Sequence, residues 1–228
     1  MTLHLPQPPA GAQHAVLAAL VPEGGLPPSA AAVLRLGAGR PRPLLALPVH
    51  VLRGPGARPT AAERTGWRFL LRRDEPAVPP AAAEASEADT PAGRTGAVDV
   101  VELADGAGGF DPAGLDEVVA AAEVVEGPGG PAFSHVTAGP YLDSTVRALR
   151  QAWQLSHGAA GRFEPRLLSL PEHYASALWL HSARPGEDLM IPLAPAPLGV
   201  AGHQVLPAAE LLARLERSPA ARPTALIG

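Results

Sequence analysis

The densest group of side chains that could do chemistry lies between residues 172 and 188. It combines two imidazoles with carboxylates: Glu172, His173, His181 and Asp188. Imidazole nitrogens and carboxylate oxygens act as general acids and bases, and they also bind metal ions. His173 and His181 are eight residues apart, so they would share one face of a sheet if one continuous strand joined them. These four residues are the candidates for an enzyme with an acid–base or metal-assisted reaction.

The same residues also have an ordinary structural interpretation. Residues 182–188 have the composition of a hairpin turn, in which acidic side chains such as those of Glu187 and Asp188 accept local hydrogen bonds. We favour this interpretation and assign no catalytic residue, no metal and no cofactor. The enzyme remains the alternative hypothesis.

Other motifs of catalysis or nucleotide binding are weak. Two serines lie close to histidines in the sequence: Ser134 precedes His135, and Ser169 lies near His173. Neighbouring residues of a strand point to opposite faces, so we expect no contact between Ser134 and His135. The glycines of residues 106–109 match no phosphate-binding pattern, and the chain has no lysine to bind phosphate. No G-x-S-x-G or H-E-x-x-H motif occurs.

The composition excludes further classes of function. The 228 residues carry a formal net charge of −4, whereas a nucleic-acid-binding protein usually has a basic surplus. The absence of cysteine excludes disulfides, thiolate metal sites and thiol nucleophiles. No apolar stretch is long enough to span a membrane, and the N-terminal apolar run has no basic flank. We therefore expect a cytoplasmic protein that binds neither nucleic acid nor membrane.

The clearest boundary in the chain is the acidic segment Asp74–Thr95. It contains four prolines and five acidic residues and almost no large apolar side chain, a composition typical of linkers and exposed loops. We divide the chain into a β-rich region at 1–73, an acidic Pro/Ala-rich linker or long loop at 74–96, and an α+β domain at 97–228. A single domain with residues 74–96 as a loop is an equal alternative.

The elements that must position the candidate residues are of both types. Apolar patterns predict extended chain or strands at 14–21, 43–53, 67–73, 97–103, 163–170, 175–181 and 189–193. Capping and apolar stripes predict helices at 29–36, 111–127, 140–157 and 207–217. The expected fold class is α+β, with one or more antiparallel sheets and three or more packed helices.

One internal similarity suggests two related β units on either side of the acidic segment. Residues 44–50 (LLALPVH) and 167–173 (LLSLPEH) agree at five of seven positions. If the match records a duplication, His50 and His173 occupy equivalent places and are structural. In a chain this rich in leucine, alanine and proline, a chance match is the other interpretation.

Surface candidates point to contacts with protein. Arg147 and Arg150 lie on the polar face of the helix expected at 140–157, where they could bind an acidic partner. Trp67, Trp153 and Trp179 are expected in the core, and Trp179 is a candidate interface anchor. We therefore expect a non-enzymatic adaptor, accessory or assembly component that acts through a protein partner or through self-association.

Overall fold

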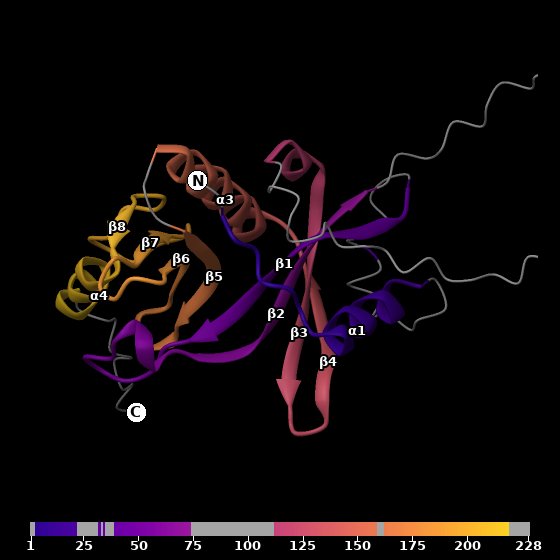
Figure 1. The fold of residues 1–228 in the computed structure, drawn as a ribbon, viewed down its shortest axis with the longest axis horizontal. Coiled ribbons are helices and arrows are strands. Elements are labelled where there is room, and N and C mark those ends of the chain that lie inside the picture. The colour runs from indigo at the N-terminus through magenta and orange to yellow at the C-terminus, as the bar shows by residue number, and fades with distance from the viewer. Residues whose placement is uncertain are drawn as a thin grey trace, which may run out of the picture.

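A computed structural model describes residues 3–21, 39–73, 112–158 and 162–218, together with residues 32 and 34. Its strands form one eight-stranded sheet in the order β4-β3-β2-β1-β5-β6-β7-β8 (Figure 1). The strands are β1 Pro41–Val51, β2 Glu63–Arg73, β3 Val118–Gly127, β4 Gly130–Thr137, β5 Phe163–Leu170, β6 Ala175–Ser182, β7 Leu189–Pro192 and β8 Leu206–Pro207. The helices are α1 Ala10–Leu20, α3 Pro140–Gly158 and α4 Ala208–Arg217, with 3-10 turns η1 Pro59–Ala61, η2 Pro112–Glu117 and η3 Pro171–His173. The fold is therefore α+β, as expected.

The sheet consists of two antiparallel meanders, β1–β4 and β5–β8. They meet in one parallel pair, in which Val49–Val51 of β1 lie beside Leu167–Ser169 of β5. Beyond that short contact the two meanders diverge (Figure 1), and Leu3 forms a parallel bridge to Phe163 at the start of β5. The sheet is mixed, so the expectation of purely antiparallel pairing was wrong at this junction.

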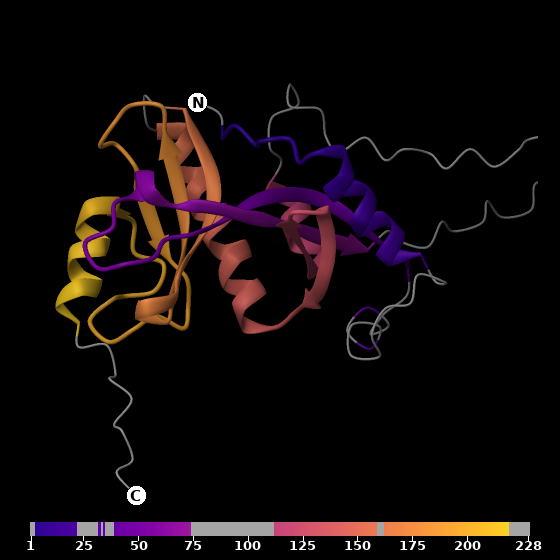
Figure 2. The ribbon, with the colours of Figure 1, turned by 90° about the horizontal axis from the view of Figure 1, so that it is seen from below.

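Helices cover both faces of the sheet (Figure 2). Because successive side chains of a strand point to opposite faces of the sheet, Leu167 packs beneath α3 and Leu168 packs beneath α4. α1 lies on the same face as α4 but covers the β1–β4 meander, where it contacts Trp67 and Phe69 in one buried cluster. Burial on both faces explains why the strand sequences are continuous apolar runs rather than alternating ones.

Most of the expected elements in the C-terminal half are confirmed. The strands predicted at 163–170, 175–181 and 189–193 and the helices predicted at 140–157 and 207–217 match β5, β6, β7, α3 and α4 within two residues. The strands predicted at 43–53 and 67–73 correspond to β1 and β2. The strand predicted at 97–103, residues 74–96 and most of the helix predicted at 29–36 lie outside the described residues.

Two elements differ in type from the prediction. Residues 111–127 were expected to form a helix, but only the six-residue turn η2 is helical. The segment from Val118 onward, which contains four valines, forms β3, the second strand from one edge of the sheet. Residues 14–21 were expected to be extended, but Ala10–Leu20 form α1, whose buried side carries Ala12, Val16 and Ala19.

The seven-residue similarity does not correspond to equivalent positions. His50 is a buried residue inside β1, whereas His173 lies in η3, after β5 has ended. β2 and β3, which are consecutive strands in the described part of the chain, are hydrogen-bonded neighbours. Among the helices that the structure describes, none is long and apolar enough to cross a membrane.

Candidate functional site

The structure brings together only two of the four sequence candidates, His181 and Asp188. His181 lies near the end of β6 and Asp188 directly before β7, and their Nδ1 and Oδ1 atoms are 3.3 Å apart. The Asp188 carboxylate also accepts hydrogen bonds from the Trp179 indole N–H at 3.0 Å and from the Ser182 backbone N–H at 2.8 Å. Asp188 therefore joins the turn to the core, in the way expected for an acidic turn residue.

Glu172 and His173 lie at the opposite end of β6. They belong to η3, which ends at Tyr174 in the left-handed region (φ 49°), so no continuous strand joins His173 to His181. Six residue steps of β6 separate Ala175 from His181, which corresponds to about 20 Å. The condition for His173 and His181 to share a sheet face is therefore not met.

Glu172 instead stabilises a loop. Its Oε1 atom accepts a hydrogen bond from the Gly54 backbone N–H at 3.1 Å, and this bond is the main reason why the pKa of Glu172 is below its usual value. In the described part of the chain, no three histidine, aspartate or glutamate side chains are grouped so that they could hold a metal ion. The two carboxylates, Glu172 and Asp188, thus lie at opposite ends of β6, and each accepts hydrogen bonds from structural neighbours.

A buried ring cluster that the sequence did not indicate surrounds Trp179. The ring of His50 contacts the Trp179 indole edge to face with centroids 5.5 Å apart, and the Arg166 guanidinium lies 4.8 Å from the Trp179 centroid. Arg166 is fixed by a 2.7 Å bond to Glu164. His50 is buried, and its Nδ1 atom has no hydrogen-bond partner among the described residues. Burial, followed by the nearby positive charge of Arg166, lowers the pKa of His50 to about 4.

We predict a pH dependence of stability from His50. Between pH 6.5 and about 4 the unfolded chain binds a proton at this imidazole and the folded protein does not, so stability is lost as the pH falls through this range. From pH 6.5 to 5 the loss should approach about 1.4 kcal/mol per pH unit. The measurement is the free energy of unfolding from urea titrations at several pH values. The control variant His50→Gln has no imidazole at this position and should lose less stability as the pH falls. Equal pH dependence in both proteins would contradict the prediction.

A serine–histidine contact that the sequence did not suggest joins α3 to the loop between β7 and β8. Ser144 Oγ lies 3.2 Å from His203 Nε2 and accepts a hydrogen bond from the Ala194 backbone N–H at 2.7 Å. Desolvation, and next the charge of Arg147, lowers the pKa of His203. Ser144 is buried, and its oxygen is occupied by a backbone donor, so the pair holds the loop rather than a substrate. The residues are 59 positions apart, and no local pattern indicates their contact.

Ser134 and His135 contact each other, contrary to expectation. Ser134 Oγ lies 3.0 Å from His135 Nδ1. The register of β3 with β4 shifts at this point, since Glu123 pairs with His135 and Val124 with Phe133, so Ser134 is the extra residue of a β-bulge. The bulge breaks the strict alternation of side chains on which the expectation depended. Both side chains are exposed on the outermost strand. Ser169, the other serine candidate, lies opposite Ser176 in the β5–β6 ladder.

The candidates for protein contact are in different surroundings. Arg147 is exposed on α3, whereas Arg150 is paired with Asp116 of η2. Trp179 is 3 % exposed and belongs to the core beneath α4, so its indole is not on the surface.

Loops gather at the end of the sheet where β1, β5 and β7 finish, which we call the loop end. It comprises residues 52–62, 171–174 and 193–205 and the last turn of α4. Gly54 and Gly56 donate backbone hydrogen bonds to Glu172 and to Glu216 of α4, and a small pocket is enclosed between these segments. The loop end therefore has a defined conformation.

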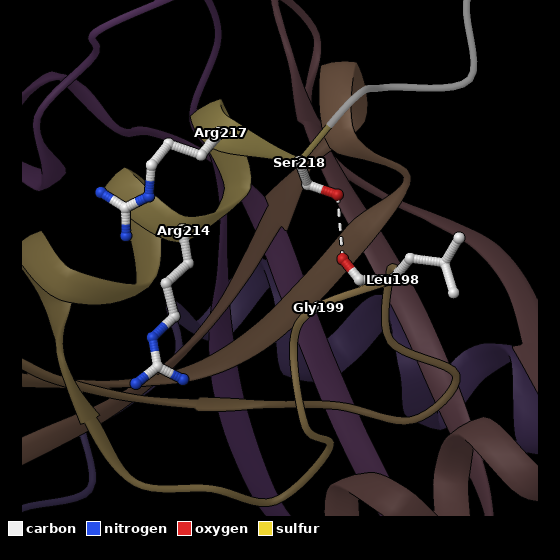
Figure 3. Close-up of a pocket in the computed structure, with 5 residues that line it drawn as sticks. All are labelled: Leu198, Gly199, Arg214, Arg217 and Ser218. Atoms are coloured by element: carbon white, nitrogen blue, oxygen red, sulfur yellow. Dashed lines mark hydrogen bonds between the residues drawn. The ribbon is translucent and has the colours of Figure 1, made fainter.

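A shallow groove beside α4 opens at the loop end (Figure 3). It is lined by Leu198, Gly199, Arg214, Arg217 and Ser218. Ser218 Oγ donates to the Leu198 carbonyl at 2.9 Å, and the Leu198 side chain points away from both arginines. Arg214 is held by Glu210 at 2.5 Å and by Gln204 at 3.2 Å, whereas Arg217 is exposed. This groove is an open surface and does not enclose a small molecule.

The chain matches no protein-family model, no curated protein and no solved structure.

Proposed function

We propose that this protein is a non-enzymatic adaptor or assembly component that acts through protein–protein contacts, with the loop end as its recognition surface. The observation that carries the proposal is the exposure of Tyr174 and Leu198, which are 80 % and 89 % exposed. They are the most exposed large apolar side chains in the described part of the chain, and both lie at the loop end. Exposed tyrosine and leucine side chains at one end of the molecule offer apolar surface that a protein partner would cover.

The two side chains are held on ordered backbone. Two hydrogen bonds fix the loop that carries Leu198. Ser218 Oγ donates to the Leu198 carbonyl, and the Ala194 backbone N–H donates to Ser144 Oγ. Tyr174 has φ 49°, a conformation that is uncommon for a non-glycine residue and costs of the order of 1 kcal/mol. A preorganised surface loses less conformational entropy on binding, which favours affinity. Exposure of two anchors on a fixed backbone therefore supports a role in binding.

The charge of the loop end indicates the chemistry of the partner. Arg53, Arg58 and Arg217 are exposed there, while the two acidic side chains Glu172 and Glu216 are occupied by backbone N–H groups. Tyrosine and arginine are enriched among the residues that dominate binding energy in protein interfaces. The partner we propose is a protein that presents apolar side chains together with carboxylates.

The test is quantitative capture of partners from native cells with three purified, tagged proteins. These are the wild type, the double variant Tyr174→Ser/Leu198→Ser, and the control Leu155→Ser, whose site on α3 is 37 % exposed. We expect at least one protein to be retained by the wild type and the control and to be reduced at least tenfold by the double variant. That protein, once purified, should show the same order of affinities. Equal retention by all three proteins, or no retention by the wild type, would overturn the proposal.

A further inference from the structure

We infer that the protein forms a two-fold symmetric dimer in which β4 of one copy pairs antiparallel with β4 of a second copy. This surface lies at the edge of the sheet farthest from α4 (Figure 1), so the inference is independent of the loop end and goes beyond the function proposed for it.

The two edges of the sheet differ in kind. β8 forms one edge and has only two residues, one of which is a proline, so it offers almost no pairing surface. β4 forms the other edge and has eight residues, and no described residue pairs with its outer side. An open strand of this length presents unpaired N–H and C=O groups, which are a template for another strand.

The β4 edge carries no charge that would oppose pairing. Its sequence, GPAFSHVT, contains no aspartate, glutamate or arginine. Exposed edges are commonly protected by charges, by prolines or by bulges. Pro131 lies next to the turn and the bulge lies at Ser134. In the rest of β4, the backbone N–H and C=O groups of alternate residues point away from β3 and are open to hydrogen bonds with another strand. Phe133 and Val136 are only partly buried against the core beneath α1, and an added strand would cover them further.

α1 provides the second, independent observation. Its 11 residues contain no charged side chain, and a helix without a charged face is usually buried on all sides. α1 packs against β4 and β3 through Ala12, Val16 and Ala19, but Ala18 and the following Val21 are exposed. Figure 1 shows α1 beside β4 at the same edge of the molecule. The exposed side of α1 and the outer edge of β4 thus lie at the same edge of the sheet, and neither α1 nor β4 contains an aspartate, glutamate or arginine.

A second copy fits this surface better than a different partner. A two-fold axis perpendicular to the sheet would place both β4 strands side by side and both α1 helices on the same face, so one interface would cover both features. A two-fold interface uses the same patch twice and must be complementary to itself. Charged side chains near the axis would face their own copies with equal sign, and an uncharged surface avoids this repulsion.

Single cysteines provide the sharpest test, because the chain contains none. Opposite residues in an antiparallel pair have Cα atoms about 4.5–5.5 Å apart, within the range of a disulfide. Ala132→Cys, Ser134→Cys and His135→Cys sample β4, and Gln154→Cys on the exposed face of α3 is the control. Under mild oxidation we expect at least one β4 variant to form a covalent dimer in high yield and the control to stay uncrosslinked.

Light scattering and a charge-repulsion variant complete the test. The wild type should have twice its monomer mass of 23.3 kDa at tens of micromolar. The double variant Ala132→Arg/Ala18→Arg places like charges about the two-fold axis. It should raise the dissociation constant of the dimer at least tenfold, whereas the control Gln154→Arg should not. Circular dichroism checks that each variant is folded. A monomeric wild type at 100 µM, or a dimer that is unaffected by the arginine pair, would overturn the inference. The double variant Tyr174→Ser/Leu198→Ser should remain dimeric, which separates this test from that of the loop end.

Discussion

Replacing Gly66 with alanine is expected to destabilise the protein by about 3 kcal/mol or more. Gly66 lies in β2 between Val49 of β1 and Val125 of β3. A Cβ atom at this position would lie 2.0 Å from the Val124 carbonyl oxygen and 3.0 Å from backbone carbons of Val124 and Val125. These are backbone atoms of a strand that is paired on both sides and they cannot rotate away, so β2 and β3 would have to separate and lose ladder hydrogen bonds.

The measurement is thermal or urea unfolding followed by circular dichroism. For a chain of this size the expected loss corresponds to a decrease in Tm of about 6–12 °C. Gly127→Ala is the matched control, since a Cβ at Gly127 meets nothing within 4 Å, and its stability should change by less than about 1 kcal/mol. If Gly66→Ala and Gly127→Ala have equal Tm values, β2 and β3 do not approach each other as closely as described.

Gly66 also illustrates where strand boundaries were misread. The sequence predicted a strand from Trp67, but β2 begins at Glu63 and includes Gly66. The glycine is required at this point by the close approach of β3. The partner of Gly66 in β3, Val125, is 59 residues away in the sequence, so no local pattern could reveal the constraint. Local signals were sufficient for strands bounded by turns, such as β5, β6 and β7.

The two elements of wrong type have a common physical cause. In β3, residues 118–122 form an apolar run because α1 lies over one face of the strand and the cluster beneath α3 over the other. Such a run has no period of two, and its spacing matched a helical stripe by coincidence. In α1, the polar residues Gln13 and His14 are neighbours and form no stripe at helical spacing, so the apolar residues that follow did not distinguish helix from strand. Both errors arise where an apolar run lacks the periodicity that local prediction needs.

The candidate site was predictable only where it is local. The interpretation of Asp188 as a turn residue that accepts hydrogen bonds agrees with its bond to Ser182, six residues earlier. The cluster of His50 with Trp179 and the contact of Ser144 with His203 both depend on which strands and loops become neighbours. The first depends on the parallel β1–β5 junction and the second on the position of the β7–β8 loop against α3, and the sequence has no local signal for either.

Replacing Asp188 with alanine is the second change with a large expected effect, a loss of about 2–4 kcal/mol. The substitution leaves the indole N–H of Trp179 and the backbone N–H of Ser182 without their acceptor in a largely buried place. Each unsatisfied buried donor costs about 1–3 kcal/mol. Urea unfolding measures the loss. The neighbouring Glu187→Ala is the control: Glu187 forms only an exposed ion pair with Arg184 at 3.6 Å, so its loss should change stability by less than about 1 kcal/mol.

A double-mutant cycle separates the structural role of Asp188 from a catalytic one. Trp179→Phe removes the indole donor and retains an aromatic ring, so the two substitutions together should cost less than the sum of the single changes, with a coupling of about 0.5–3 kcal/mol. A carboxylate kept for catalysis would show the opposite pattern, because active-site polar groups often reduce stability and their removal then stabilises the fold. If Asp188→Ala is as stable as the wild type and shows no coupling to Trp179→Phe, the His181–Asp188 pair returns as a candidate for acid–base chemistry.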